Sequence, residues 1–98
     1  MSSKNAKLFQ AADAGDHRMV ARLLDQGAQI NFRDSMGWTP LMIAASKGHT
    51  STVNLLLDRG AQIEARAANS ATALMLASQN GHTSTVRLLL DRGARLIS

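Results

Sequence analysis

The sequence predicts an all-α solenoid built from stacked pairs of short helices. Residues 48–61 return at 81–94 with a single difference, Asn54 in the first copy and Arg87 in the second. A fainter copy runs from Gly15 to Ala28, again thirty-three residues earlier. A fixed period of about 20–50 residues is typical of repeat proteins, in which each unit buries its apolar face against its neighbours. The period divides the chain into three units, 1–33, 34–66 and 67–98.

The middle unit carries start and stop signals for two helices. Thr39 is a good N-cap, and Pro40 stands in the first turn, where a proline is tolerated. Gly48 offers the left-handed stop of the first helix, and the second is expected to begin near residues 49–50 and end at Gly60. Residues 61–70 have no helical stripe and are expected to form an extended turn before a helix at Thr72. The expected apolar faces are Leu41, Ile43, Ala44 and Ala45 in the first helix and Val53, Leu56 and Leu57 in the second.

The order of residues in this unit resembles an ankyrin repeat. The matching positions are Asp34, Gly37, Thr39, Pro40, Leu41, Ile43, Ala44, Ala45, Gly48, His49, Val53, Leu55, Leu56, Leu57, Gly60 and Ala61. The resemblance covers nearly the whole chain as three consecutive units, and it implies an all-α ankyrin-repeat solenoid of stacked helix pairs with β-hairpin-like finger loops. It also implies a module that binds a protein partner through its finger tips and the exposed face of the first helices.

The sequence departs from the family pattern at several positions. Methionines 42 and 75 stand where the family has a histidine, so the usual threonine–histidine hydrogen bond cannot form. Methionine is expected to fill the space instead. The third unit also lacks the family's Asp, Gly and Pro, which predicts a less tightly specified finger; the replacements are Ala67, Ser70 and Ala73.

The two ends of the repeat array differ in polarity. Gln10 and Arg22 stand at positions that are apolar in the later units, which predicts a capping first unit. The third unit keeps the apolar residues and is expected to be uncapped, so it belongs to a longer array or has its outer face covered. Leu96 and Ile97 add apolar surface there. We therefore expect either a two-fold homodimer through the C-terminal repeat or a loosened third unit.

Composition narrows the classes of function. The chain has no cysteine, which excludes disulfides and thiol chemistry. His49 and His82 recur at the period, but stacked helices lie about 8–10 Å apart, so a shared metal ion is disfavoured against a structural role at the helix junction. The aspartates at helix ends are expected to be solvated or to cap, and no catalytic constellation or phosphate loop is present. We predict no enzyme activity and no cofactor.

The charge and the N-terminal sequence bear on partners and compartment. The net charge is +4 with 11 Lys and Arg, which favours acidic partners. Nucleic acid is the alternative partner class, although the chain has no platform of several aromatic residues and no groove-reading motif. The N-terminus lacks the apolar stretch of a signal peptide, and no apolar run approaches the roughly 20 residues of a membrane span. The expectation is an intracellular protein without a membrane segment.

The resemblance places the partner-binding surface on the fingers and the first helices. Trp38 is the sharpest candidate, because Trp and Arg are enriched at binding hot spots, although packing on its own finger is an equal alternative. Positive charge on this strip makes an acidic protein segment the favoured ligand. A designed or excised repeat fragment without a selected partner is a third interpretation. The predicted contact residues are Arg33, Ser35, Met36, Trp38, Ser46, Lys47, Arg66, Asn69, Gln79 and Asn80.

Overall fold

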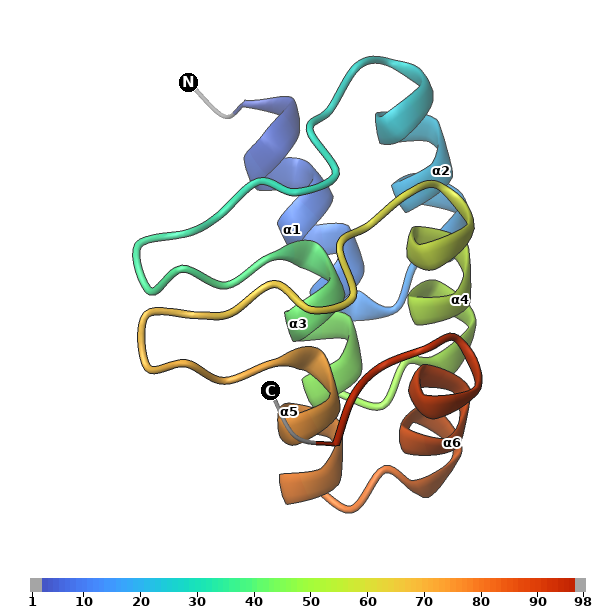
Figure 1. Ribbon diagram of the computed structural model, residues 1–98. Helices are drawn as coiled ribbons and strands as arrows, with labels where there is room; N and C mark the ends of the chain where they lie inside the picture. Colours follow the sequence, from blue (N-terminus) through green and yellow to red (C-terminus); the bar gives the residue numbers. More distant parts are fainter. Residues whose placement is uncertain (1–2, 97–98) are drawn as a thin grey trace.

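The computed structural model describes residues 3–96 and shows three antiparallel helix pairs stacked side by side (Figure 1). The first helices of the pairs form one layer and the second helices form the other, while two loops project from the side of the first layer. The prediction of an all-α solenoid is confirmed. In order the helices are α1 (Lys4–Ala14), α2 (His17–Asp25), α3 (Pro40–Ser46), α4 (Thr50–Asp58), α5 (Ala73–Gln79) and α6 (Thr83–Asp91).

The helix boundaries follow the capping signals of the sequence. The side-chain oxygen of Thr39 caps α3 by accepting a hydrogen bond from the backbone N–H of Met42 at 3.3 Å. Thr72 caps α5 in the same way, through the N–H of Met75. Gly48 has φ 74°, a left-handed conformation that costs an L-residue more than glycine. The predicted start and stop of the first helix in the middle unit are confirmed.

The core runs along the stack between the two helix layers. It is built from aliphatic side chains, including Leu8, Val20, Leu41, Leu56 and Leu89. A second cluster lies near the fingers and consists of Met42, Ala67, Ala71 and Leu76, with Trp38 and Ala65 packed against it. Met42 is only 1% exposed, so it fills the space where the family has a histidine, as the sequence predicts.

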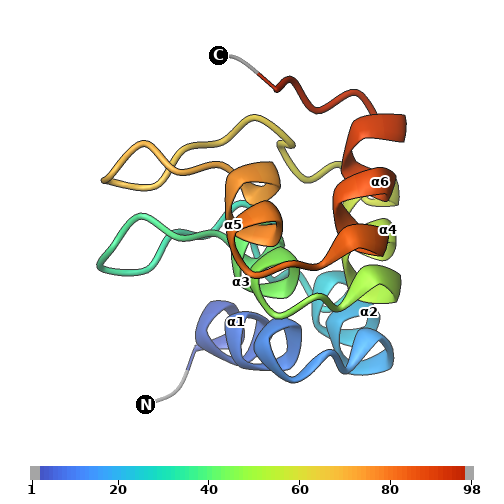
Figure 2. The same ribbon diagram turned by 90° about the horizontal axis from the view of Figure 1, so that it is seen from below.

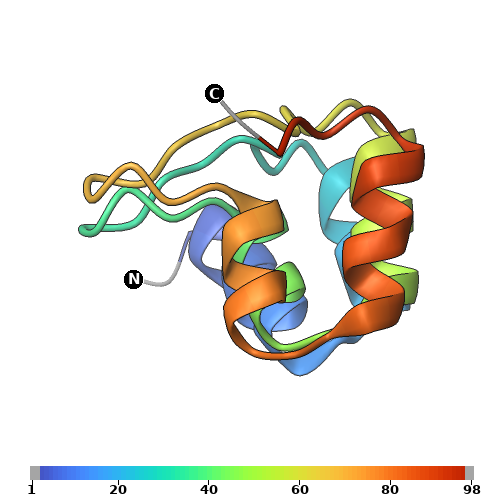
Figure 3. The same ribbon diagram turned by 60° about the horizontal axis from the view of Figure 1, so that its bottom comes forward.

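The two projecting loops lie side by side, as the views in Figures 2 and 3 agree. We call them the first finger (33–39) and the second finger (66–72). The N–H of Ala68 donates to the carbonyl of Met36 at 3.1 Å, which joins the fingers. In the first finger Asp34 Oδ1 accepts two backbone hydrogen bonds, from Met36 and Trp38, at 2.9 and 2.8 Å.

The second finger has fewer side-chain hydrogen bonds of its own, in line with the sequence prediction. Ala67 has no carboxylate, and the turn is supported instead by Asn69 Oδ1, which accepts one hydrogen bond from the N–H of Ala71. Ser70 takes the place of Gly37 and adopts φ 70°, the one positive φ outside glycine among the residues described. A serine in this region carries local strain.

Successive units are joined by charged and imidazole side chains near the helix ends. Asp25 and Asp58 accept hydrogen bonds from the arginines of the following unit, Arg59 at 2.6 Å and Arg92 at 2.8 Å. Both carboxylates remain largely exposed to solvent, Asp25 at 68% and Asp58 at 56%, as expected from the sequence, and each is in addition paired with an arginine of the next unit, which the sequence did not predict. Asp16, in contrast, caps α2 as expected.

The two ends of the stack expose different kinds of residue. Gln10 and Arg22 are exposed on the outer side of the first unit. At the other end, Leu90 is 38% and Leu96 is 74% exposed, which leaves apolar surface on the third unit. Ile97, the other apolar residue expected there, lies outside the described residues. Over the range 3–96, no helix has the length and apolar character that crossing a membrane requires.

Candidate functional site

The ten predicted contact residues lie on the fingers and at the ends of α3 and α5. Seven of them are exposed and three are partly buried, so none is lost to the core. Met36 is the most prominent apolar member, because its side chain is 63% exposed in the turn of the first finger. The exposed set is Arg33, Ser35, Met36, Lys47, Asn69, Gln79 and Asn80, and the partly buried set is Trp38, Ser46 and Arg66.

The two arginines at the bases of the fingers are held in place by backbone carbonyls. Arg33 Nη1 donates to the carbonyl oxygens of Gly37 at 3.0 Å and Arg66 at 2.6 Å. Arg66 Nη1 donates to the carbonyl of Ser70 at 3.1 Å. A guanidinium has five N–H donors, so these contacts orient both side chains while leaving further donors and the full positive charge.

The side chain of Trp38 is only partly available to a binding partner. The residue is partly buried and packs against the second apolar cluster. The packing alternative raised by the sequence therefore has direct structural support.

The remaining polar members of the surface are partly engaged with one another. Lys47 Nζ lies 3.1 Å from Asp13 Oδ1, close enough for an ion pair, although no hydrogen bond of good geometry reaches that oxygen. Asn80 Nδ2 donates to both the carbonyl and the hydroxyl oxygen of Ser46, each at 2.9 Å. Ser46 and Asn80 thus join the second and third units, and Lys47 carries less net charge to a partner than Arg33 does.

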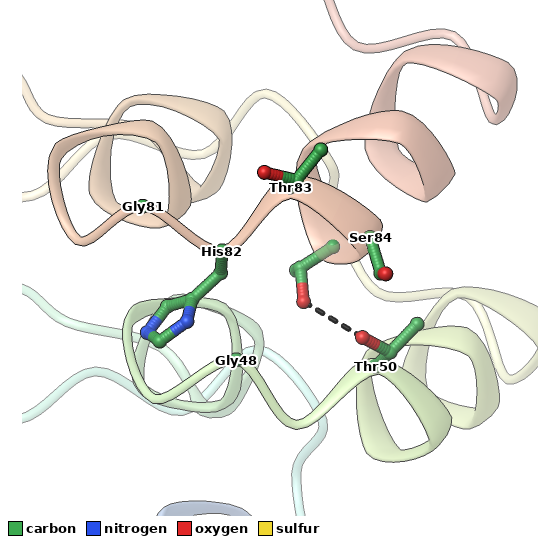
Figure 4. Close-up of a pocket in the computed structure, with 7 residues that line it drawn as sticks. Gly48, Thr50, Gly81, His82, Thr83 and Ser84 are labelled. Carbon is green, nitrogen blue, oxygen red and sulfur yellow. Dashed lines mark hydrogen bonds between the residues drawn. The ribbon is translucent and has the colours of Figure 1, made fainter.

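A shallow pocket at the junction between the helices of the second and third units is shown in Figure 4. His82 Nε2 donates to the carbonyl of Ser46 at 2.9 Å, and the imidazole ring lies against Gly48. Across the pocket, Thr50 and Thr85 share a hydrogen bond of 2.8 Å between their hydroxyl oxygens. Each of these hydrogen bonds joins the second unit to the third, so His82 has a structural role at the helix junction, as expected.

The same histidine contact occurs one unit earlier. His49 Nε2 lies 2.8 Å from the carbonyl of Asp13, and because a carbonyl oxygen only accepts, Nε2 carries the hydrogen. Sequence reasoning placed both histidines at the helix junction but missed the acceptor, which depends on how closely the units stack. Across residues 3–96, no group of three or more His, Cys, Asp or Glu side chains is placed to hold a metal ion.

Comparison with known proteins identifies the repeat. The family model for ankyrin repeats, in three copies, matches residues 8–98. The chain belongs to the ankyrin-repeat family. Mitochondrial disaggregase from Bos taurus is 52% identical over 44 residues, and the human protein of that name is 48% identical over the same length. An ankyrin repeat, SAM and basic leucine zipper domain-containing protein from Equus caballus is 44% identical over 46 residues.

These alignments are short on both sides. They cover 45% of this chain and 6% of each disaggregase, and 47% of this chain and 10% of the Equus caballus protein. The ankyrin chain therefore spans a tenth or less of the length of these curated relatives. Ankyrin repeats are generally protein-interaction modules and are typically not catalytic, and that general function is what the family membership carries over.

Proposed function

We propose that this ankyrin chain is a non-catalytic interaction module that binds an acidic segment of a protein partner along its fingers and first helices. The fixed guanidiniums of Arg33 and Arg66 are the observation that carries the proposal. Both are oriented by backbone carbonyls, so little side-chain entropy remains to be lost when they bind a carboxylate. Charged hydrogen bonds of this type are roughly twice as strong as neutral ones.

The nearby acidic groups favour the same ligand chemistry. The Asp34 carboxylate already accepts two backbone hydrogen bonds within the first finger, and Asp13 is paired with Lys47. Among the described residues, neither carboxylate forms an ion pair with Arg33 or Arg66. Met36, exposed in the turn of the first finger, supplies apolar surface that adapts to different partners.

The fluorescence of Trp38, the only tryptophan of the chain, offers a direct assay. A display library of random peptides is selected on the protein, and selected peptides are titrated while the emission of Trp38 is followed. We expect enrichment of Asp and Glu, and weaker binding by the double variant Arg33→Ser, Arg66→Ser. The matched control Arg18→Ser, Arg22→Ser removes two exposed arginines from α2 and should bind normally. Selected peptides without acidic residues, or equal loss in both double variants, would contradict the proposal.

Nucleic acid is the second candidate, and the +4 net charge favours it. The same experiment is repeated with duplex DNA and single-stranded RNA over a range of salt concentrations. Because log affinity falls by about 0.9 per neutralised duplex phosphate, we expect binding to vanish near physiological salt. A complex that selects a sequence and survives that salt concentration would replace the acidic peptide by nucleic acid as the ligand.

A second copy of the chain is a further candidate partner, through the third repeat. The exposure of Leu90 and Leu96 supports this pairing. At about 25 cal/mol per Å² of buried apolar area, even a few hundred Å² would contribute several kcal/mol to association before its entropic cost. This surface lies on α6 and the segment after it, away from the finger turns that we assign to the acidic partner (Figure 2).

A further inference from the structure

The contacts between the second and third units show which face of α4 is covered by a following unit. Thr50 bonds to Thr85, and both Asn54 and Asp58 accept hydrogen bonds from Arg92 Nη1, at 2.9 and 2.8 Å. On the same helix face Val53 is fully buried. Adding thirty-three to these residue numbers gives the corresponding face of α6.

The corresponding face of α6 has no covering unit in the range 3–96 (Figure 3). Val86 is partly exposed where Val53 is fully buried, and Leu90 is 38% exposed. Arg87 and Asp91 are exposed, and within the described part of the chain neither forms an ion pair. We call these four residues the α6 outer face.

Two residues of the third unit would disfavour a fourth repeat that stacks on it in the way that the third unit stacks on the second. Arg87 replaces Asn54, so an arginine equivalent to Arg92 would meet a positive charge instead of an acceptor. At the finger, a Cβ on Gly37 would lie 2.9 Å from the backbone nitrogen of Ala68. Ser70 has that Cβ and nearly the same φ, so a following finger could not approach as closely.

We propose that the α6 outer face binds the α6 outer face of a second copy in an antiparallel, two-fold arrangement. Arg87 of each copy pairs with Asp91 of the other, and Val86 packs against Leu90 of the other. This proposal rests on the proposed pairing of two copies through the third repeat, and it specifies which residues of α6 meet in that pair.

Helical spacing makes this face complementary to itself. The charges at 87 and 91 and the apolar side chains at 86 and 90 are each four residues apart, so each pair shares one side of the helix. A two-fold axis that passes between positions 88 and 89 brings residue 87 to within about one residue of the level of residue 91 of an antiparallel partner, and residue 86 equally near residue 90, and a two-fold contact closes as a dimer. The one residue that separates the two copies of the fourteen-residue repeat, Arg87, thus supplies the charge that makes α6 self-complementary.

The test uses charge reversal and reconstitution with the full chain. Sedimentation velocity is measured from about 5 to about 500 µM, because an interface at the small end of the size range associates weakly. The unsubstituted chain should dimerise. Arg87→Asp and Asp91→Arg each place like charges opposite each other, and each should weaken self-association at least about tenfold. An equimolar mixture of the two variants should form heterodimers, because the introduced aspartate then faces the introduced arginine, and the unchanged Asp91 of one chain faces the unchanged Arg87 of the other.

The mixture separates loss of the contact from loss of the fold, since misfolded variants could not restore each other. Arg18→Asp on α2 gives the same change in net charge as Arg87→Asp, away from the α6 outer face, and should dimerise normally. A chain that stays monomeric throughout the concentration range would overturn both the pairing and its geometry. A dimer that survives both charge reversals, or a mixture without heterodimers, would overturn the α6 geometry while leaving pairing through the third repeat intact.

Discussion

Two glycines with the same backbone conformation provide a matched test of the contact between repeats. Gly48 and Gly81 both have φ 74° at the junction between the helices of their units. A Cβ at position 48 would lie 2.5 Å from Nδ1 of the His82 ring, whereas a Cβ at position 81 would meet nothing within 4 Å. Gly48→Ala and Gly81→Ala therefore share the backbone strain and differ in the steric clash with His82.

The expected costs follow from these contacts. The left-handed conformation costs an alanine roughly 1–2 kcal/mol at either position. At Gly48 the His82 ring must also move and give up its hydrogen bond to the Ser46 carbonyl, which is worth about 0.5–1.5 kcal/mol. That carbonyl keeps its bond from Asn80, so the further penalty of an unpaired group is avoided. We expect the free energy of unfolding to fall by about 1–2 kcal/mol in Gly81→Ala and by about 1.5–3.5 kcal/mol in Gly48→Ala.

Urea unfolding followed by far-ultraviolet circular dichroism measures both costs, with the slope m compared to confirm that the same transition is observed. The two variants are then repeated in a His82→Ala background. Without the imidazole, Gly48→Ala should cost as little as Gly81→Ala. Equal costs in the unsubstituted chain, or a difference that persists without His82, would show that the ring contact does not stabilise the stack.

Three further substitutions test individual features of the structure by the shift of the urea midpoint. Ser70→Gly should stabilise by about 1 kcal/mol, because it relieves a left-handed serine; unchanged stability would argue against that strain. Asp16→Ala should destabilise by about 1 kcal/mol, since its carboxylate accepts the N–H of Met19 at the start of α2, and Asp16→Asn should retain most of the cap. Positions 17 and 52 are equivalent to positions 50 and 85, whose threonines share a hydrogen bond, but the buried hydroxyl of Thr52 has no partner. His17→Thr should supply that partner and stabilise by about 1 kcal/mol, whereas the control Arg18→Thr should leave stability unchanged.

The sequence predicts the helices and their order because local signals repeat at a fixed period. Thr39 caps α3 as expected, α5 begins directly after Thr72, where a helix was expected, and Gly48 follows α3 in the left-handed conformation. These features depend on hydrogen bonds within three or four residues, so one unit contains all the information needed. The exposure of Gln10 follows from the same period, which shows where an apolar position has become polar.

Contacts between units were harder to predict, because they depend on the distance and rotation between neighbouring helix pairs. The acceptor of His82 is the carbonyl of Ser46, 36 residues away, and the partner of Asp58 is Arg92, 34 residues away. The ion pairs did have a sequence signal, since an Asp-Arg dipeptide recurs at 58–59 and 91–92. No sequence signal indicated that Asn69 would support the second finger, because the family motif has its supporting Asp at the position of Ala67.

The family pattern predicts which residues lie on the candidate contact surface but not how they are held there. The period places Arg33 and Arg66 at equivalent positions, but it does not reveal that the first donates to the backbone carbonyl of the second at 2.6 Å. That bond requires the two fingers to lie side by side. It orients the Arg33 guanidinium, as the Ser70 carbonyl orients that of Arg66, and the proposed recognition of an acidic segment depends on these two fixed charges.

Residues that interrupt the period carry the information that the repeat itself cannot. The residues that recur in every unit form its helices and its contacts with the preceding unit. They therefore say nothing about what covers the last unit. Ser70 and Arg87 each replace a residue of the middle unit that directly contacts the third unit, Gly37 at the finger and Asn54 on α4. Both changes fall on the outward side of the third unit, and both oppose a repeat of the same kind. The outward face of the third unit is therefore chemically distinct from that of the second, and the proposed second copy would present Asp91 to Arg87 and Arg87 to Asp91.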